Sequence, residues 1–232
     1  MEQSTTSVHL DDYEQPGFYL VLKDSTRLTL TRDNIEKVTL EYWMNPDKIP
    51  PSVKRAVEFK RCPFCPLKAK EDICDAVRPV LPFLDVVDRY VSFDEVLAIY
   101  KSDAGLLHIS NTTMQEALRY VSTLSLMSYC QVGKKYWRYY FGIMPLEKAK
   151  DFASKLYLNM YWIHKGDKEN VNRLISEFHE RVTTTTQNQL ARLNLICKND
   201  AFLNAFVSAQ MVTEFLEMNK DTGLFGENQL DG

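Results

Sequence analysis

The sequence lacks the features that mark most enzymes and membrane proteins. No apolar run reaches the length that spans a bilayer, and there is no glycine-rich phosphate loop or Gly-x-Ser-x-Gly nucleophile elbow. His179-Glu180 resembles the start of a zinc-protease helix, but the second histidine of that motif is replaced by Thr183. The first fifteen residues are polar and contain no apolar segment typical of a secretory signal. We therefore expect a cytoplasmic protein with no membrane partner, and the missing motifs lean against an enzyme.

Composition says more about partners than about the fold. The 232 residues are 45% hydrophobic and include 12 Phe and 12 Tyr, enough to bury a sizeable core without crosslinks. The formal charge of -3 argues against a polyanion as partner. The run 134–140 interleaves basic and aromatic residues, as in binders of single-stranded nucleic acid. We interpret it instead as a strand or loop whose rings enter the core, so nucleic acid is not an expected partner.

The N-terminal quarter of the chain shows the alternation of half-buried strands. Apolar residues alternate with polar ones between residues 17 and 43, most clearly around Leu28 to Leu30 and Val38 to Tyr42. Lys23-Asp24-Ser25 is typical of a hairpin turn. A further short strand is predicted through Val57 and Phe59, leading to the first cysteine.

The remainder of the chain predicts one hairpin and several helices. Thr113-Met114-Gln115-Glu116 fits a capping box that starts a helix ending near Cys130. The other predicted elements are a short helix over 79–90, a hairpin of 93–100 with 106–110, helices over 145–166 and 168–197, and a last helix capped by Asp200.

These elements predict an α+β fold, with N-terminal antiparallel strands, a central hairpin plus helices, and a C-terminal layer of long helices. We expect disordered tails at 1–15 and 219–232. Between them we expect a β-rich subdomain over 16–60 and a cysteine-bearing α+β domain, with the C-terminal helices, over 61–218.

Four cysteines form the one constellation that suggests unusual chemistry. Cys62 and Cys65 are a Cys-x-x-Cys pair, a spacing that turns both sulfurs toward one ion, and Cys74 and Cys130 follow. A closed site of four thiolates suits zinc, adds folding free energy and leaves no position open for catalysis. An iron–sulfur cluster uses the same ligands, so sequence leaves the metal open. Cys197 lies on the apolar stripe of the long helix and is assigned to the core.

Two interpretations of these cysteines without a bound metal compete with the metal site. Free cysteines behave as small hydrophobic residues, so four of them can pack in a core or form a facultative disulfide. The pair at 62–65 is also similar to the active-site motif of glutaredoxins, where a helix N-terminus stabilises the thiolate. Pro66 directly after the pair, and the missing β-α-β frame before it, depart from that pattern.

Residues 62–67, Cys-Pro-Phe-Cys-Pro-Leu, resemble the signature of a family of uncharacterised bacterial proteins known only as a domain of unknown function. The resemblance continues through 91–96, 112–118 and 199–205, and covers roughly residues 57 to 216. It implies that Cys62, Cys65, Cys74 and Cys130 belong together, and it implies no activity. The chain departs from the family where Asp75 and Gln131 replace prolines after the third and fourth cysteines. A histidine usual before Pro145 is also missing.

Taken together, the sequence predicts a non-enzymatic protein that binds another protein or itself and whose fold is clamped by a zinc site. The alternative is a redox-active protein, either an iron–sulfur carrier or a thiol switch at Cys62 and Cys65. A small-molecule enzyme would need a pocket that the sequence does not reveal.

Overall fold

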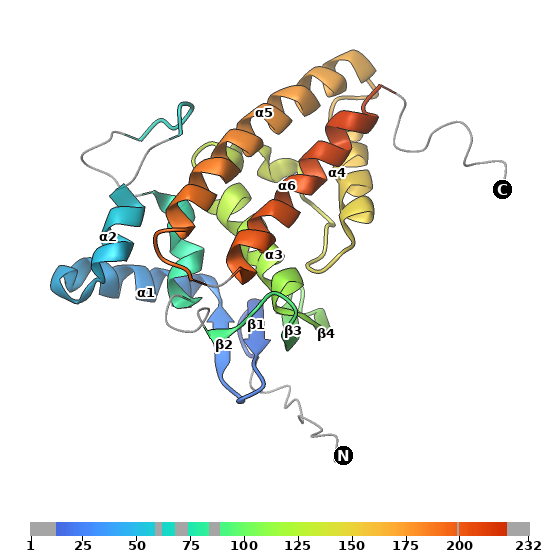
Figure 1. Ribbon diagram of the computed structural model, residues 1–232. Coiled ribbons are helices and arrows are strands. Elements are labelled where there is room, and N and C mark those ends of the chain that lie inside the picture. The colour runs from blue at the N-terminus through green and yellow to red at the C-terminus, as the bar shows by residue number, and fades with distance from the viewer. Residues whose placement is uncertain (1–12, 59–61, 68–73, 84–88, 199, 222–232) are drawn as a thin grey trace.

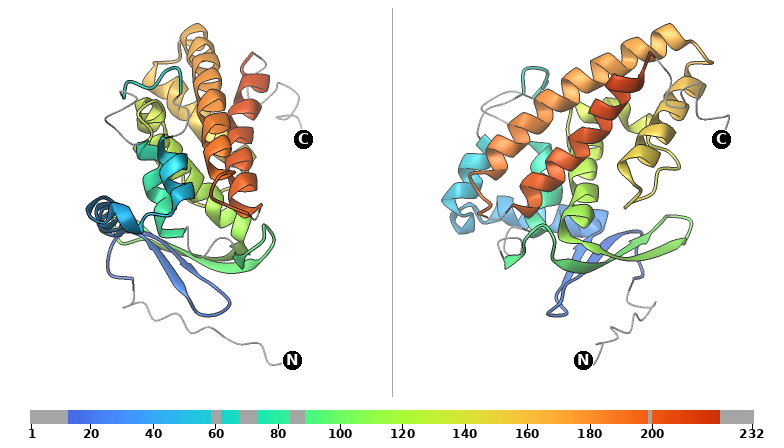
Figure 2. Two further views of the ribbon diagram at one scale, coloured as in Figure 1. Left: turned by 60° about the vertical axis from the view of Figure 1, so that its left-hand side comes forward. Right: turned by 45° about the vertical axis from the view of Figure 1, so that its right-hand side comes forward.

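The computed structural model describes residues 13–58, 62–67, 74–83, 89–198 and 200–221. It has the predicted α+β architecture, with a four-stranded antiparallel sheet at one end and helices packed above it (Figure 1). In both views of Figure 2 the long C-terminal helices lie above the sheet. No helix within the described ranges is long and apolar enough to cross a membrane.

The sheet joins two hairpins that are far apart in sequence. Its strands are β1 (Gly17–Val21), β2 (Arg27–Leu30), β3 (Glu95–Lys101) and β4 (Leu107–Thr113), in the order β2-β1-β3-β4. Both predicted hairpins are confirmed. In the first turn the Ser25 amide donates to the Leu22 carbonyl at 2.9 Å, and in the second the Gly105 amide donates to the Ser102 carbonyl at 2.9 Å. Gly105 has φ +80°, a conformation that glycine adopts without strain.

Alternation along β1 sends side chains to both faces of the sheet. Phe18 and Leu20 enter the main core beneath the helices, whereas Tyr19 and Val21 form a small cluster on the opposite face. Tyr13, which falls within the predicted N-terminal tail, is buried in that cluster with its ring centroid 5.0 Å from that of Tyr19. Residues 1–12 and 222–232 of the predicted tails lie outside the described residues.

The strand predicted around Val38 to Tyr42 is wrong, because α1 (Arg32–Met44) is a helix. Thr31 caps it by accepting a hydrogen bond from the Asn34 amide. Ile35, Val38 and Tyr42 pack inward at helical spacing, but the exposed Leu40 makes the segment alternate as a strand does. The predicted strand through Val57 is also wrong, since α2 (Pro51–Glu58) is helical, and Phe59 lies outside the described residues.

The central segment differs from prediction mainly at its boundaries. The 3₁₀ helix η3 (Asp75–Phe83) begins before Pro79, where a helix over 79–90 was predicted, and residues 84–88 lie outside the described part. Thr113 caps α3 (Met114–Leu124) as predicted, accepting from the Glu116 amide at 3.4 Å. The remaining short elements are η2 (Pro46–Lys48), the π-helical turn η5 (Ser125–Tyr129) and the 3₁₀ helix η6 (Gly133–Tyr139).

Three long helices complete the fold: α4 (Ala149–Ile163), α5 (Lys168–Leu193) and α6 (Ala201–Asn219). The start predicted at Pro145 is wrong by four residues, because residues 142–148 form a loop before α4. Asp200 sits at the N-cap of α6 but makes no capping bond there. Its carboxylate accepts instead from the Ser92 amide and the Asn204 side chain, which ties α6 to the start of the central hairpin.

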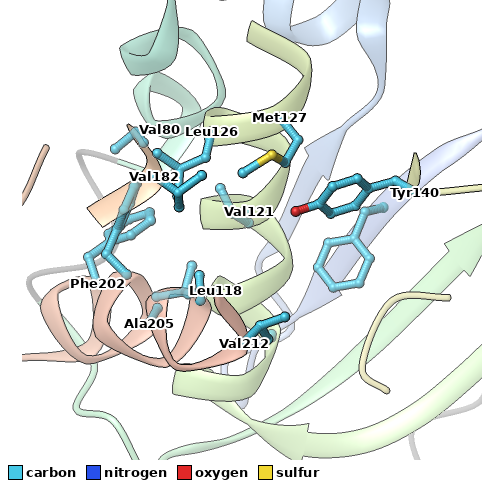
Figure 3. Packing of buried hydrophobic residues seen from close by; sticks show 14 of the residues in the cluster. Val80, Leu118, Val121, Leu126, Met127, Tyr140, Val182, Phe202, Ala205 and Val212 are labelled. Atoms are coloured by element: carbon cyan, nitrogen blue, oxygen red, sulfur yellow. The ribbon is translucent and has the colours of Figure 1, made fainter. Parts of the chain in front are cut away.

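The main core forms where α3 lies between the sheet and the C-terminal helices. In Figure 3, Leu118 and Val121 of α3 face Phe202 and Ala205 of α6, with Val182 of α5 beside them. Such close packing fixes the positions of α5 and α6 relative to the segments that carry the cysteines.

Candidate functional site

Short, tightly turned segments carry the four cysteines. Cys62 and Cys65 lie on the piece of chain after α2, where the Cys65 amide donates to the Cys62 carbonyl at 3.0 Å. Cys74 directly precedes η3, and its carbonyl accepts from the Val77 amide at 3.0 Å. Cys130 follows the last residue of η5. The Ser125 hydroxyl donates to the Ala76 carbonyl at 2.5 Å, which holds η5 against η3.

The fold brings all four predicted ligands to the wall of one cavity of about 10 Å³. Cys62 and Cys130 are buried, and Cys65 and Cys74 are half-buried. None of the five cysteines forms a disulfide. Cys197 does not line this cavity and is buried in the main core, as predicted from its place on the apolar stripe.

The four sulfurs surround the cavity without closing on a common point. Over the described ranges, no group of three or more His, Cys, Asp or Glu side chains is placed to hold a metal ion. Residues 68–73, between the second and third cysteines, lie outside those ranges. The structure therefore gathers the predicted ligands but leaves their coordination of an ion a proposal.

A polar face of α5 lies against the cysteines. Thr185, Asn188, Gln189 and Arg192 follow the i, i+3, i+4, i+7 spacing of one helix face, and all four are buried. The Arg192 Nη1 atom donates to the Cys74 Sγ atom at 2.7 Å, and the Gln189 Nε2 atom donates to the same sulfur at 3.3 Å. The guanidinium thus places a positive charge directly against this sulfur.

Cys62 faces the same helix. Burial raises the pKa of the Cys62 thiol, and the Arg192 guanidinium opposes that rise. Hydrogen bonds from Thr185 and Asn188 lower the pKa by smaller amounts. The net direction is upward, which is the opposite of what activates a redox cysteine.

Cys130 is held by backbone donors. Burial raises the pKa of its thiol to about 11, while the amides of Val132 and Gly133 hydrogen-bond to the sulfur and oppose the rise. Gly133 is required at this position because an added Cβ would lie 1.7 Å from the Leu126 carbonyl oxygen. Paired backbone amides pointing at a sulfur would stabilise a thiolate once a metal supplies the compensating charge.

Sequence reasoning missed the polar face of α5. Its helical spacing was a readable signal, but a polar stripe on a helix is usually solvated. Thr185 and Thr186, within the hydroxyl run at 183–186, are also buried. The strand or loop predicted over 134–140 is mostly the helix η6. Tyr136, Tyr139 and Tyr140 enter the core as predicted, but Trp137 is 49% exposed, so the prediction is wrong for that ring.

The fold and the site together define an α+β protein with a cluster of cysteines backed by a buried polar helix face. Residues 22–225 match the family described as a domain of unknown function, DUF6901, and the chain belongs to that family. This confirms the predicted membership of an uncharacterised family and assigns no activity. No curated protein and no solved structure matches the chain.

Proposed function

We propose that Cys62, Cys65, Cys74 and Cys130 bind one zinc ion as a closed structural site, and that the chain is a non-enzymatic module that associates with itself. The observation that carries the zinc proposal is the convergence of four cysteines on one small cavity beside a buried arginine. Zinc accepts four thiolates in a tetrahedron and needs no open position in such a site.

The size of the cavity supports a single ion over a cluster. Its volume of about 10 Å³ is close to the roughly 10–15 Å³ that one water molecule requires. A four-iron cluster would need a much larger space between the same sulfurs.

The charge of the surroundings supports thiolates in this cavity. Four thiolates and one Zn²⁺ carry a net charge of about −2, which is costly to bury without compensation. Arg192 is 2% exposed and contacts Cys74, so it supplies a positive charge where the centre would need one. The backbone amides of Val132 and Gly133 add neutral donors at Cys130, another of the four sulfurs.

A thiol switch at Cys62 and Cys65 receives less support. Such a switch needs an attacking thiol with a depressed pKa, whereas burial raises the pKa of Cys62. Metal binding removes this obstacle, because the ion itself deprotonates the thiols that bind it.

An aromatic surface on α4 supports self-association. Trp162 is 73% exposed, and its ring centroid lies 5.9 Å from that of Phe141, which is also exposed. Leu158, one turn before Trp162, completes the patch. A hollow of about 530 Å³ lined by Leu158, Tyr161 and Trp162 adjoins it. A two-fold interface would place each protruding Trp162 in the hollow of the other copy.

Elemental analysis of the protein purified anaerobically without added metal tests the zinc site. We expect about one zinc per chain, with the four ligand cysteines protected from thiol reagents until a chelator is added. Absence of zinc and iron, with the thiols titrating freely, would refute the metal proposal. Iron with a visible absorption band would show a cluster in place of zinc.

Sedimentation velocity tests the self-association. We expect the average mass to rise toward that of a dimer between about 10 and 300 µM. Trp162→Asp should remain monomeric over this range, because it places a charge at the centre of the patch. Trp43→Asp, a change at another exposed tryptophan, is the control and should associate normally. A wild-type protein that stays monomeric throughout would contradict the proposal.

A further inference from the structure

A second, larger cavity lies between the sheet and the start of α4, and it shares no lining residue with the cysteine cavity. Its volume is about 190 Å³. Its wall includes five aromatic residues: Tyr100, Tyr120, Trp137, Tyr140 and Phe152. They come from β3, α3, η6, the residue after η6, and α4, so the complete fold is needed to enclose the space.

The volume fits a molecule with a single ring. An engineered cavity of about 150 Å³ lined by apolar side chains binds benzene. The present cavity is slightly larger and its wall carries polar groups as well, which is typical of sites that bind and orient a small ligand.

The charged groups in the wall are already paired within the protein. The Arg119 guanidinium lies 2.8 Å from the Glu116 carboxylate and donates to the Glu147 carbonyl at 2.5 Å. The Glu147 carboxylate forms an ion pair with Lys155. A charged ligand would therefore enter without a counter-ion and lose its hydration, at a cost in free energy. The cavity is thus suited to a neutral molecule.

Two groups in the cavity wall can form hydrogen bonds to a ligand. One is the Tyr120 hydroxyl, whose pKa is raised by burial, so it stays protonated and can donate. The other is the Glu147 Oε2 atom, which is buried and accepts no hydrogen bond in the described part of the chain. A ligand hydroxyl could accept from Tyr120 and donate to Glu147, and so satisfy both groups.

The loop that closes the cavity is held in a strained conformation. Leu146 has φ +68°, in the left-handed region that a branched residue rarely adopts. It directly precedes Glu147, whose Oε1 atom accepts from the Met144 amide at 2.9 Å. This bond and the Lys155 ion pair fix the loop, and with it the orientation of the Glu147 carboxylate.

We propose that this cavity binds a small neutral molecule with one aromatic ring and one hydroxyl group. The proposal does not depend on the zinc site. Calorimetric titration with four probes of similar size tests it: benzyl alcohol, toluene, benzoate and benzylammonium. We expect benzyl alcohol to bind at least about tenfold more tightly than either charged probe, and about threefold or more tightly than toluene.

Thr123→Met and Tyr120→Phe test whether benzyl alcohol binds in this cavity. Thr123→Met fills the cavity from α3 and should weaken benzyl alcohol at least about tenfold. Its matched control is Thr184→Met on α5, which also replaces a half-buried threonine bonded to the carbonyl four residues before it and should change affinity less than about twofold. Tyr120→Phe removes one hydroxyl and should lower the affinity for benzyl alcohol to that for toluene.

Three results would overturn the proposal. The first is that none of the probes binds to protein whose circular dichroism shows it folded. The second is that benzoate or benzylammonium binds as tightly as benzyl alcohol. The third is that Thr123→Met and Tyr120→Phe both leave the affinity for benzyl alcohol unchanged.

Discussion

Replacing Cys130 by serine is expected to remove zinc from the protein, from about one ion per chain to less than about 0.2. Cys130 is 5% exposed and approached by two backbone amides, so no water or neighbouring side chain can easily replace its sulfur. Three remaining thiolates would hold the ion far more weakly. Elemental analysis after gel filtration measures the content.

The control is Cys197→Ala, which removes a buried sulfur that does not line the cysteine cavity. This variant should keep its zinc even if the cavity left in the core lowers its stability. Full zinc content in Cys130→Ser, or equal loss in both variants, would contradict the assignment of ligands.

Loss of zinc should also lower stability, because a site formed only in the folded state contributes its binding free energy to folding. In the wild-type protein the ion would join the segment at 62–67, the start of η3 and the end of η5. In the metal-free protein the bonds of Ser125 to Ala76 and of Gln131 to Asp75 still join the end of η5 to the start of η3, but neither bond holds the segment at 62–67.

Much of the fold could be predicted because its signals are local. Alternation identified both hairpins, and Thr113 marked the start of α3. The failure at α1 has a physical cause. Its inward face carries Ile35, Val38, Thr39 and Tyr42 at helical spacing. Leu40 is 56% exposed, and with Val38 and Tyr42 it completes an alternation that imitates a strand.

The cysteine cavity could likewise be predicted in part, whereas the polar face of α5 and the aromatic cavity could not. The four cysteines could be grouped from their identity, the Cys-x-x-Cys spacing of the first two and the resemblance to an uncharacterised family. Whether the polar residues of α5 face solvent or thiols is decided by the packing of α5 against a segment more than a hundred residues earlier, as the bond from Arg192 to Cys74 shows. The aromatic cavity has still less local signal, because its wall is assembled from five elements and a loop.

Arg192→Met is expected to destabilise the zinc-loaded protein by about 3 kcal/mol, because it would leave a buried anionic centre without its nearest cation. Methionine keeps an unbranched apolar chain of similar length, so the change mainly removes charge and donors. In the metal-free protein, where burial favours neutral thiols, the same substitution should cost less than half as much. Urea denaturation of both forms, with and without zinc, measures the four free energies of unfolding.

The difference between the two losses is the coupling between Arg192 and the ion. By linkage, a coupling of about 2 kcal/mol weakens zinc binding roughly 30-fold, which competition with a chromophoric chelator measures independently. Arg173→Met, an exposed position on the same helix, should change neither quantity appreciably. If Arg192→Met instead costs the same with and without zinc, the arginine serves only the packing of α5, and the charge argument for a thiolate centre fails with it.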